Sequence, residues 1–176
     1  MRFTARKLTL MAVLTAIALI VFIIEAQIPL PIPIPGAKLG LANTVTLFAL
    51  FFSTGGKSGT VRLTATDAFM ILICRIILGA VFTGRAIAFL YSLTGGLLGF
   101  AAQAALKRFV TTKQIWVCGA IGAIFHNIGQ ILIAMLIMRT PSIAAYLPFL
   151  IIAGVITGII TGFVAQFTIA RLAINN

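Results

Sequence analysis

Acidic side chains are nearly absent from this chain of 176 residues, which carries only Glu25 and Asp67 against thirteen Lys and Arg residues. Charged residues of both signs amount to 9% of the sequence, whereas an average soluble domain has roughly 25%. Hydrophobic residues amount to 61%, and a soluble domain of this length could not bury so much apolar surface. We therefore predict a multi-pass integral membrane protein, with residues 1–176 forming a single membrane domain.

The scarcity of carboxylates and thiols excludes several kinds of catalytic site. Two carboxylates in different segments cannot build the Asp-rich Mg²⁺ sites of diphosphate chemistry. Cys74 and Cys118 lie in apolar runs without metal-ligand spacing, so both are expected to be small buried side chains. The Gly-Lys-Ser sequence at 56–58 resembles part of a phosphate loop, but Phe51 stands where the first glycine is required. We expect a protein that is not an enzyme, with no catalytic residue, metal or cofactor.

Six apolar runs are expected to form membrane-spanning helices, since about 20 helical residues cross the hydrocarbon core. The second run has thirteen residues, which rise about 20 Å as a helix, so either residues 38–40 extend it or it does not cross fully. Glycines at four-residue intervals in the last run favour close packing of helix backbones. The runs cover residues 8–24, 41–53, 66–82, 86–106, 115–138 and 146–172.

The net charge of +11 indicates membrane orientation rather than binding of nucleic acid, because cytoplasmic loops of membrane proteins collect Lys and Arg. With the N-terminus inside, nine of these cations lie on the cytoplasmic side, and three, Lys38, Arg85 and Arg139, lie outside. Five or seven spans would place the termini on opposite sides and remove this asymmetry. The predicted fold is therefore an all-α bundle of six transmembrane helices with both termini in the cytoplasm.

Residues 25–40 are predicted to form a proline-rich outer loop. Pro29, Pro31, Pro33 and Pro35 alternate with apolar residues, which excludes a helix and favours an extended chain. Two interpretations stay open for this segment. It is either a rigid connector on the membrane surface or a lid that folds over an outward-facing pocket.

Polar side chains inside the spans indicate a binding pocket. A central Arg costs about 2.5–3.5 kcal/mol on insertion scales, so Arg75 must face protein, water or a ligand. His126, Asn127 and Gln130 are three and four residues apart, which is expected to bring them to one side of a helix. The alternatives are an Arg held by backbone carbonyls and waters, and polar side chains that only link helices. The predicted substrate-binding residues, all on one level of the bundle, are Lys38, Asn43, Arg75, Tyr91, His126, Asn127 and Gln130.

Several blocks of sequence are similar to a known family. They are Pro35-Gly-Ala-Lys-Leu-Gly-Leu-Ala-Asn43, the run around Arg75, Tyr91-Ser-Leu-Thr-Gly-Gly96 and His126-Asn-Ile-Gly-Gln130. Together they resemble the Gx transporter family, also labelled heptaprenyl diphosphate synthase component I, over nearly the whole chain. That family looks like the membrane-embedded, substrate-binding S components of energy-coupling factor transporters. Those proteins have six helices, cytoplasmic termini and a first outer loop that closes the pocket.

The resemblance also implies partners and a location. S components dock a shared transmembrane coupling subunit through an A-x-x-x-A motif on the first helix, which corresponds here to Ala12 and Ala16. Because the chain has no nucleotide-binding motif, two partner ATPase subunits would supply the energy. The expected location is the bacterial cytoplasmic membrane, in contact with lipid.

Two functions follow as hypotheses. The first is capture of a small-molecule substrate for uptake, with a ligand that is small, partly anionic and partly apolar, such as a vitamin-like compound or an isoprenoid or quinone precursor. The second is a non-transporting membrane partner of a prenyl diphosphate synthase or of a quinone- or flavin-linked redox assembly. The residues offer no support for synthase activity in this chain itself. The proteins that co-purify with it distinguish the two hypotheses.

Overall fold

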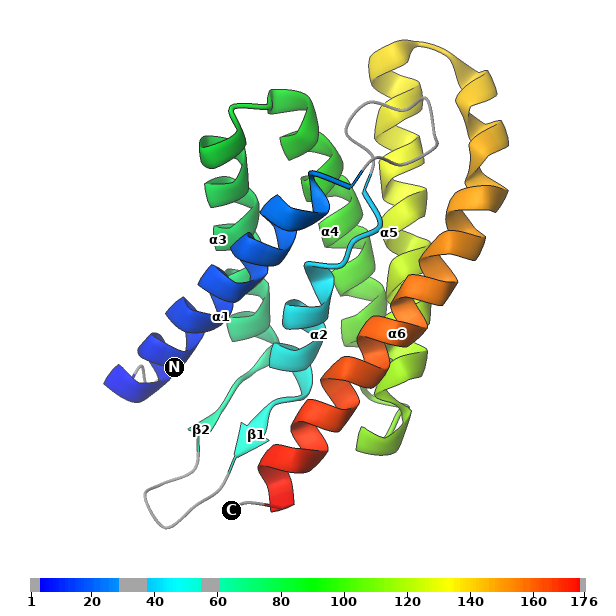
Figure 1. Ribbon diagram of the computed structural model, residues 1–176. Coiled ribbons are helices and arrows are strands. Elements are labelled where there is room, and N and C mark those ends of the chain that lie inside the picture. Colours follow the sequence, from blue (N-terminus) through cyan, green and yellow to red (C-terminus); the bar gives the residue numbers. More distant parts are fainter. Residues whose placement is uncertain (1–3, 29–37, 55–60, 175–176) are drawn as a thin grey trace.

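The computed structural model describes residues 4–28, 38–54 and 61–174, and they form a bundle of α-helices (Figure 1). Five helices are long and apolar enough to cross a membrane. They are α1 (Ala5–Glu25), α3 (Ala65–Thr83), α4 (Ala86–Leu106), α5 (Ile115–Met138) and α6 (Leu147–Ile174). The expected class, an all-α multi-pass membrane protein, is confirmed.

Short elements connect these helices. Two 3₁₀ helices, η1 (Thr112–Gln114) and η2 (Pro141–Tyr146), precede α5 and α6. The strands β1 (Ser53–Thr54) and β2 (Val61–Arg62) pair antiparallel, at two residues each, between α2 and α3. The proline-rich residues 29–37 and residues 55–60 lie outside the described residues, so neither interpretation of the proline-rich loop is tested.

The second apolar run forms a short buried helix, α2 (Asn43–Phe51). Its nine residues rise about 13 Å, less than half of the roughly 30 Å of a hydrocarbon core, so this helix does not cross on its own. It contacts all five long helices and therefore lies inside the bundle (Figure 1). Of the six predicted spans, five are long helices and the second is this internal one.

Charged side chains bind both ends of α2. The negative charge lies at the N-terminal end and the positive charge at the C-terminal end, as the helix dipole favours. At its N-terminal end the Glu25 carboxylate accepts hydrogen bonds from the N–H groups of Gly40, Leu41 and Ala42. At its C-terminal end the Lys107 ammonium donates to the carbonyl oxygen of Leu50. These contacts satisfy terminal backbone groups that a helix leaves unpaired, which explains how so short a helix is tolerated in the interior.

Glycines permit the close approach of α4, α5 and α6. A Cβ atom built on Gly119 of α5 would lie 2.2 Å from the carbonyl oxygen of Gly158 on α6. One built on Gly99 of α4 would lie 2.9 Å from the carbonyl oxygen of Gly122 on α5. Any larger residue at these positions would push the helices apart, so the glycine stripes serve packing, as the sequence predicts.

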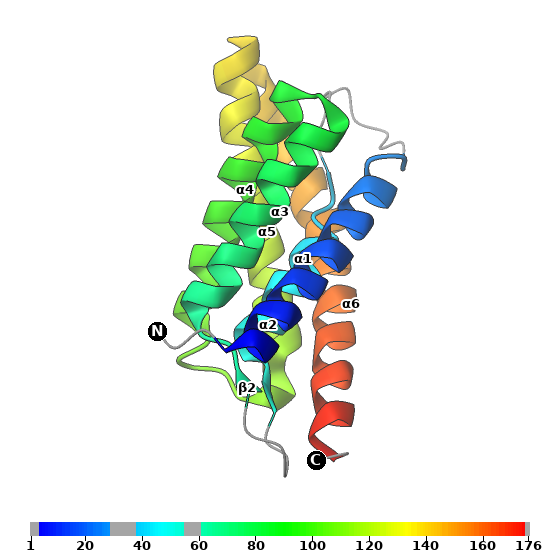
Figure 2. The same ribbon diagram turned by 90° about the vertical axis from the view of Figure 1, so that its left-hand side faces the viewer.

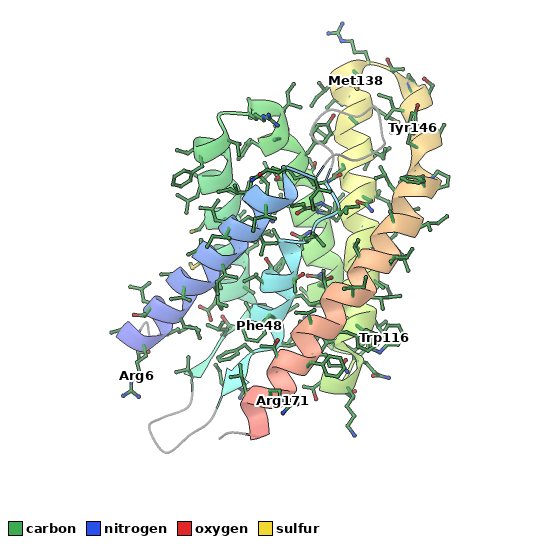
Figure 3. The ribbon with its side chains drawn as sticks, in the orientation of Figure 1. Arg6, Phe48, Trp116, Met138, Tyr146 and Arg171 are labelled. Atoms are coloured by element: carbon green, nitrogen blue, oxygen red, sulfur yellow. The ribbon has the colours of Figure 1, made fainter. Side chains whose placement is uncertain are left out.

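The start of α1 and the end of α6 lie at the same end of the bundle, called here the terminal end (Figures 1 and 2). Arg6 and Arg171 mark that end, whereas Met138 and Tyr146 mark the opposite, distal end (Figure 3). Among the described residues the terminal end carries seven Lys or Arg outside the membrane core, and the distal end carries three. The structure thus keeps the charge asymmetry on which the predicted orientation depends.

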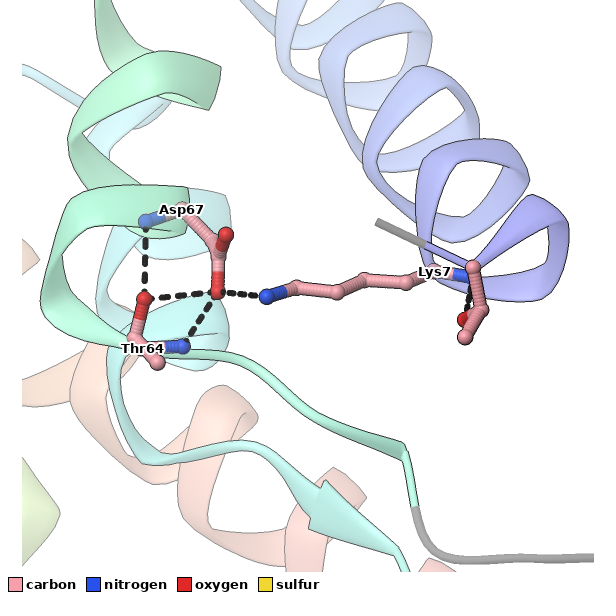
Figure 4. A network of polar contacts seen from close by, with 4 residues as sticks. Lys7, Thr64 and Asp67 are labelled. Carbon is pink, nitrogen blue, oxygen red and sulfur yellow. Dashed lines mark hydrogen bonds and ion pairs between the residues drawn. The ribbon is translucent and has the colours of Figure 1, made fainter. Parts of the chain in front are cut away.

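One ion pair closes the terminal end of the bundle between α1 and α3 (Figure 4). Lys7 Nζ lies 2.7 Å from Asp67 Oδ2. Asp67 also caps its own helix: its Oδ2 accepts from the N–H and the hydroxyl of Thr64, and its N–H donates to the Thr64 hydroxyl. The donors at the first turn of α3 thus all meet Oδ2, and Oδ1 has no hydrogen-bond partner among the described residues.

Candidate functional site

Five of the seven predicted substrate-binding residues form one connected polar cluster toward the distal end of the bundle. They are Lys38, before α2; Asn43, on its first turn; Arg75 of α3; and His126 and Gln130 of α5. The residues Arg75, His126 and Gln130 are buried, with at most 3% of their surface exposed. We call these five residues the polar cluster.

The contacts of the polar cluster run in a line from α3 to the segment before α2. Arg75 Nη2 donates to Asn43 Oδ1 at 3.0 Å, and Asn43 Nδ2 lies 3.0 Å from His126 Nδ1. His126 Nε2 lies 2.7 Å from Gln130 Nε2. Gln130 Oε1 accepts from the backbone N–H of Lys38 at 3.2 Å. Residues from three segments far apart in sequence are therefore joined through one imidazole ring.

An aromatic ring lies beside both cations of the cluster. Lys38 Nζ is 3.2 Å from the centroid of the Phe22 ring, and Arg75 Cζ is 5.5 Å from it. Gly79, one turn beyond Arg75 on α3, leaves room for this ring, because a Cβ atom there would come within 2.7 Å of Phe22. The ring face attracts both cations and shields them from lipid.

Glu25 supplies the negative charge nearest to the cluster, but its carboxylate is bound to the N-terminal end of α2. It attracts Lys38 and Arg75 electrostatically, and none of the described ion pairs joins it to either cation. Lys38 lies outside the spanning helices. Its burial lowers the pKa of its amine to about 8, and the attraction of Glu25 opposes that shift.

The polar cluster borders a small, partly open hollow with room for about one water molecule. The remaining lining residues are Phe22, Glu25, Gly40, Ala42 and Ser92. None of these five is among the seven predicted substrate-binding residues. Glu25 offered the best signal, because it is one of two acidic residues in the chain and ends an apolar run. Its partners are backbone N–H groups, which no side-chain pattern reveals.

Two predicted residues lie away from the cluster. Asn127 points to α6, where its Nδ2 donates to the carbonyl oxygen of Leu150. Tyr91 packs in an apolar group with Ile131, Ala134 and Leu150. Successive residues of a helix are rotated by about 100°, so neither shares the direction of His126 or of Ser92. Their predicted contact with a substrate stays a prediction.

Ala12 and Ala16 lie on the exposed face of α1, one turn apart. They border an open apolar groove of about 1060 Å³ between α1 and α3. Cys74 also lies in this groove and is exposed, so its predicted burial is wrong, whereas Cys118 is buried as expected. The groove offers small side chains on α1 against which another helix can approach closely.

The chemistry offered by the polar cluster is that of hydrogen-bond donation and positive charge. Among the described residues no group of three or more His, Cys, Asp and Glu side chains gathers at one place. The cluster instead combines a guanidinium, an ammonium, an imidazole and two amides within the membrane part of the chain. Such a set suits an anionic or acceptor-rich ligand.

A family model now adds evidence from outside the chain. The model for heptaprenyl diphosphate synthase component I matches residues 14–168, which include the whole polar cluster and Ala16 but not Ala12. The chain belongs to the heptaprenyl diphosphate synthase component I family. The family label expected from the sequence motifs is thus confirmed. No curated protein and no solved structure matches the chain.

Proposed function

We propose that this member of the component I family is the substrate-binding S component of an energy-coupling factor type importer in the bacterial cytoplasmic membrane. The observation that supports the proposal best is the polar cluster: two cations, one imidazole and two amides gathered beside a small hollow in a membrane bundle. Burial of so many polar groups in a membrane protein is costly and is typical of a substrate site. The protein binds its substrate and carries out no reaction on it.

The orientation proposed for this role places both termini in the cytoplasm. The terminal end of the bundle carries the larger share of Lys and Arg, as cytoplasmic surfaces do. The polar cluster then lies toward the outer side, where a substrate arrives. A ligand that suits it is small, partly anionic and partly apolar, in the class of vitamin-like compounds and isoprenoid or quinone precursors.

The groove beside Ala12 and Ala16 is the proposed docking surface for a transmembrane coupling subunit, to which two ATPase subunits bind. Replacing both alanines with Leu adds bulk at the α1 wall of the groove and should abolish co-purification of these subunits. The control is the double variant Ala101→Leu and Ala105→Leu, which adds the same bulk at the same spacing on the exposed face of α4. Co-purification that survives in the first variant, or fails equally in the control, contradicts docking at this groove.

The family name supports a second function, a non-transporting membrane partner of a prenyl diphosphate synthase. The exposed groove could equally hold such a partner or part of a quinone- or flavin-linked redox assembly. Affinity purification from native membranes distinguishes the two functions. ATPases of the ABC type support the importer, whereas a soluble prenyltransferase or redox subunits support the alternative.

A further inference from the structure

A second apolar groove lies where α1 and α6 both pack on α2, and we call it the α1–α6 groove (Figure 1). It is open, with a volume of about 230 Å³, and its lining includes Ile17 of α1, Val45 and Phe48 of α2, and Val164 of α6. Ile17 and Val164 are exposed on membrane-spanning helices, so the groove opens toward lipid. The residues that α1 contributes to it differ from those that line the groove beside Ala12.

The lining of the α1–α6 groove leaves no hydroxyl group in need of a partner. Its two hydroxyls belong to threonines, and both donate to nearby backbone carbonyls. Thr44 Oγ1 lies 2.7 Å from the carbonyl oxygen of Leu41, and Thr168 Oγ1 lies 2.7 Å from that of Val164. Such a lining gains dispersion contacts from hydrocarbon and would leave a polar occupant without hydrogen bonds. The part of an occupant that touches this groove is therefore apolar.

The size of the α1–α6 groove favours a single hydrocarbon chain over a helix of another protein. A helix about 10 Å across, rising about 1.5 Å per residue, would occupy this volume with only about two residues. The groove beside Ala12 has about 1060 Å³, against about 230 Å³ here. A partner helix therefore suits the larger groove, and a lipid chain suits the smaller one.

Positive charge lies at the terminal end of both walls of the α1–α6 groove (Figure 3). Val164, Thr168 and Arg171 are four and three residues apart, so Arg171 extends the α6 wall by one turn. On α1, Arg6 precedes Ile17 by eleven residues, which is about three turns, so both lie on one face of that helix. Both arginines are exposed. An anionic group at this end of the groove is therefore attracted, whereas a cationic group is repelled.

Both acidic residues of the chain are engaged away from Arg171. Asp67 pairs with Lys7, and Glu25 binds backbone N–H groups before α2. We propose that the α1–α6 groove binds an acyl chain of an acidic phospholipid, and that the phosphate of this lipid pairs with Arg171. The apolar lining and the width of the groove fit the chain, and the positive charge at its terminal end fits the headgroup. This inference goes beyond the proposed substrate-binding function and does not depend on it.

Native mass spectrometry of the purified full chain tests the headgroup contact, with dioleoyl phosphatidylglycerol and dioleoyl phosphatidylcholine added in turn. The acyl chains are identical, so a difference in affinity reports on the headgroup. Phosphatidylglycerol should bind about fivefold more tightly, and Arg171→Gln should remove that difference. The control is Arg108→Gln, which removes an exposed arginine after α4 at the same end of the bundle and should keep the difference. Equal binding of both lipids by the wild type, or the same loss in both variants, overturns the proposal.

A second variant tests the acyl-chain contact. Val164→Trp adds bulk inside the α1–α6 groove and should weaken the binding of both lipids severalfold. The control is Ile152→Trp, which adds a ring on α6 outside the groove and should leave lipid binding unchanged. Val164 and Ile152 are 54% and 62% exposed, so neither replacement enters the core.

Two outcomes of this second test overturn the proposal. The first is lipid binding by Val164→Trp that equals that of the wild type or of Ile152→Trp. The second is loss of co-purified subunits from Val164→Trp with lipid binding unchanged, which assigns the groove to a protein partner. Lipid binding is measured on the purified chain alone, so its failure leaves the proposed substrate-binding function standing.

Discussion

The two buried charged sites along α3 differ in whether a charge of opposite sign is paired with them. At the terminal end, Asp67 Oδ2 is paired with the Lys7 ammonium and accepts from Thr64, while Asp67 Oδ1 has no hydrogen-bond partner among the described residues (Figure 4). Toward the distal end, Arg75 has one hydrogen bond to Asn43, no partner for Nε among the described residues, and a second cation nearby. A charge that is neutralised by an ion pair within the chain is structural. Positive charge without such an ion pair is suited to an external anion.

Asp67→Asn should have the largest effect, because it removes the charge that pairs with Lys7 and weakens the cap of α3. Loss of one partner from a buried ion pair costs about 3–5 kcal/mol, so the free energy of unfolding should fall by that order. Denaturant titration in detergent micelles measures it. The double variant Lys7→Met and Asp67→Leu should recover part of the loss. A single variant as stable as the wild type would show that the terminal site does not hold α1 to α3.

Arg75→Gln should have the opposite pattern, with little loss of stability and a large loss of ligand. Charge-assisted hydrogen bonds contribute about 1.5–3 kcal/mol, which corresponds to roughly 10–100-fold in affinity. Mass spectrometry of the ligand retained by the purified protein, with Tm in parallel, measures both effects. Arg75→Lys keeps the charge but loses the planar guanidinium, so its ligand affinity should lie between those of the wild type and Arg75→Gln. A Tm drop like that of Asp67→Asn would make Arg75 a structural residue.

The smallest expected effect concerns Lys38 and pH. Burial lowers its pKa to about 8, so the ammonium is charged at pH 7 and mostly neutral at pH 9. Its contribution to anion affinity should therefore fall by up to about tenfold between pH 7 and pH 9. Stability changes the other way: above pH 8 the unfolded chain binds more protons at this amine, so the free energy of unfolding rises with pH. Mass spectrometry of the retained ligand at both pH values, with Lys38→Met as control, checks this prediction, which an equal pH dependence in that variant contradicts.

Much of the site could be predicted from the sequence because polar residues are rare in these helices. Arg75, His126 and Gln130 stand out against apolar neighbours. Polar side chains on a membrane helix avoid lipid, so they are expected to face the bundle interior. Asn127 stands out equally, yet it bonds to Leu150 of α6. Sequence spacing places residues on a helix but does not say which neighbouring helix each side faces.

Other parts of the site depend on contacts that no local pattern contains. Glu25 reaches the backbone of residues 40–42, and Lys107 reaches Leu50, so the short helix α2 is stabilised by residues distant in sequence. The thirteen-residue apolar run suggests a short element, but not that its helix lies inside the bundle with both ends capped. Phe22 lies against both cations only because Gly79 leaves space on α3.

The sequence by itself determined that this chain is a helical membrane protein, because 61% hydrophobic residues with two acids cannot fold as a soluble domain. It also determined the positions of the long helices and the residue types available to a site. The tertiary structure decided which of these residues meet. Rotation about each helix axis, set by glycine-mediated packing and by the capped α2, brings Asn43 and Gln130 onto the His126 ring and turns Asn127 and Tyr91 away.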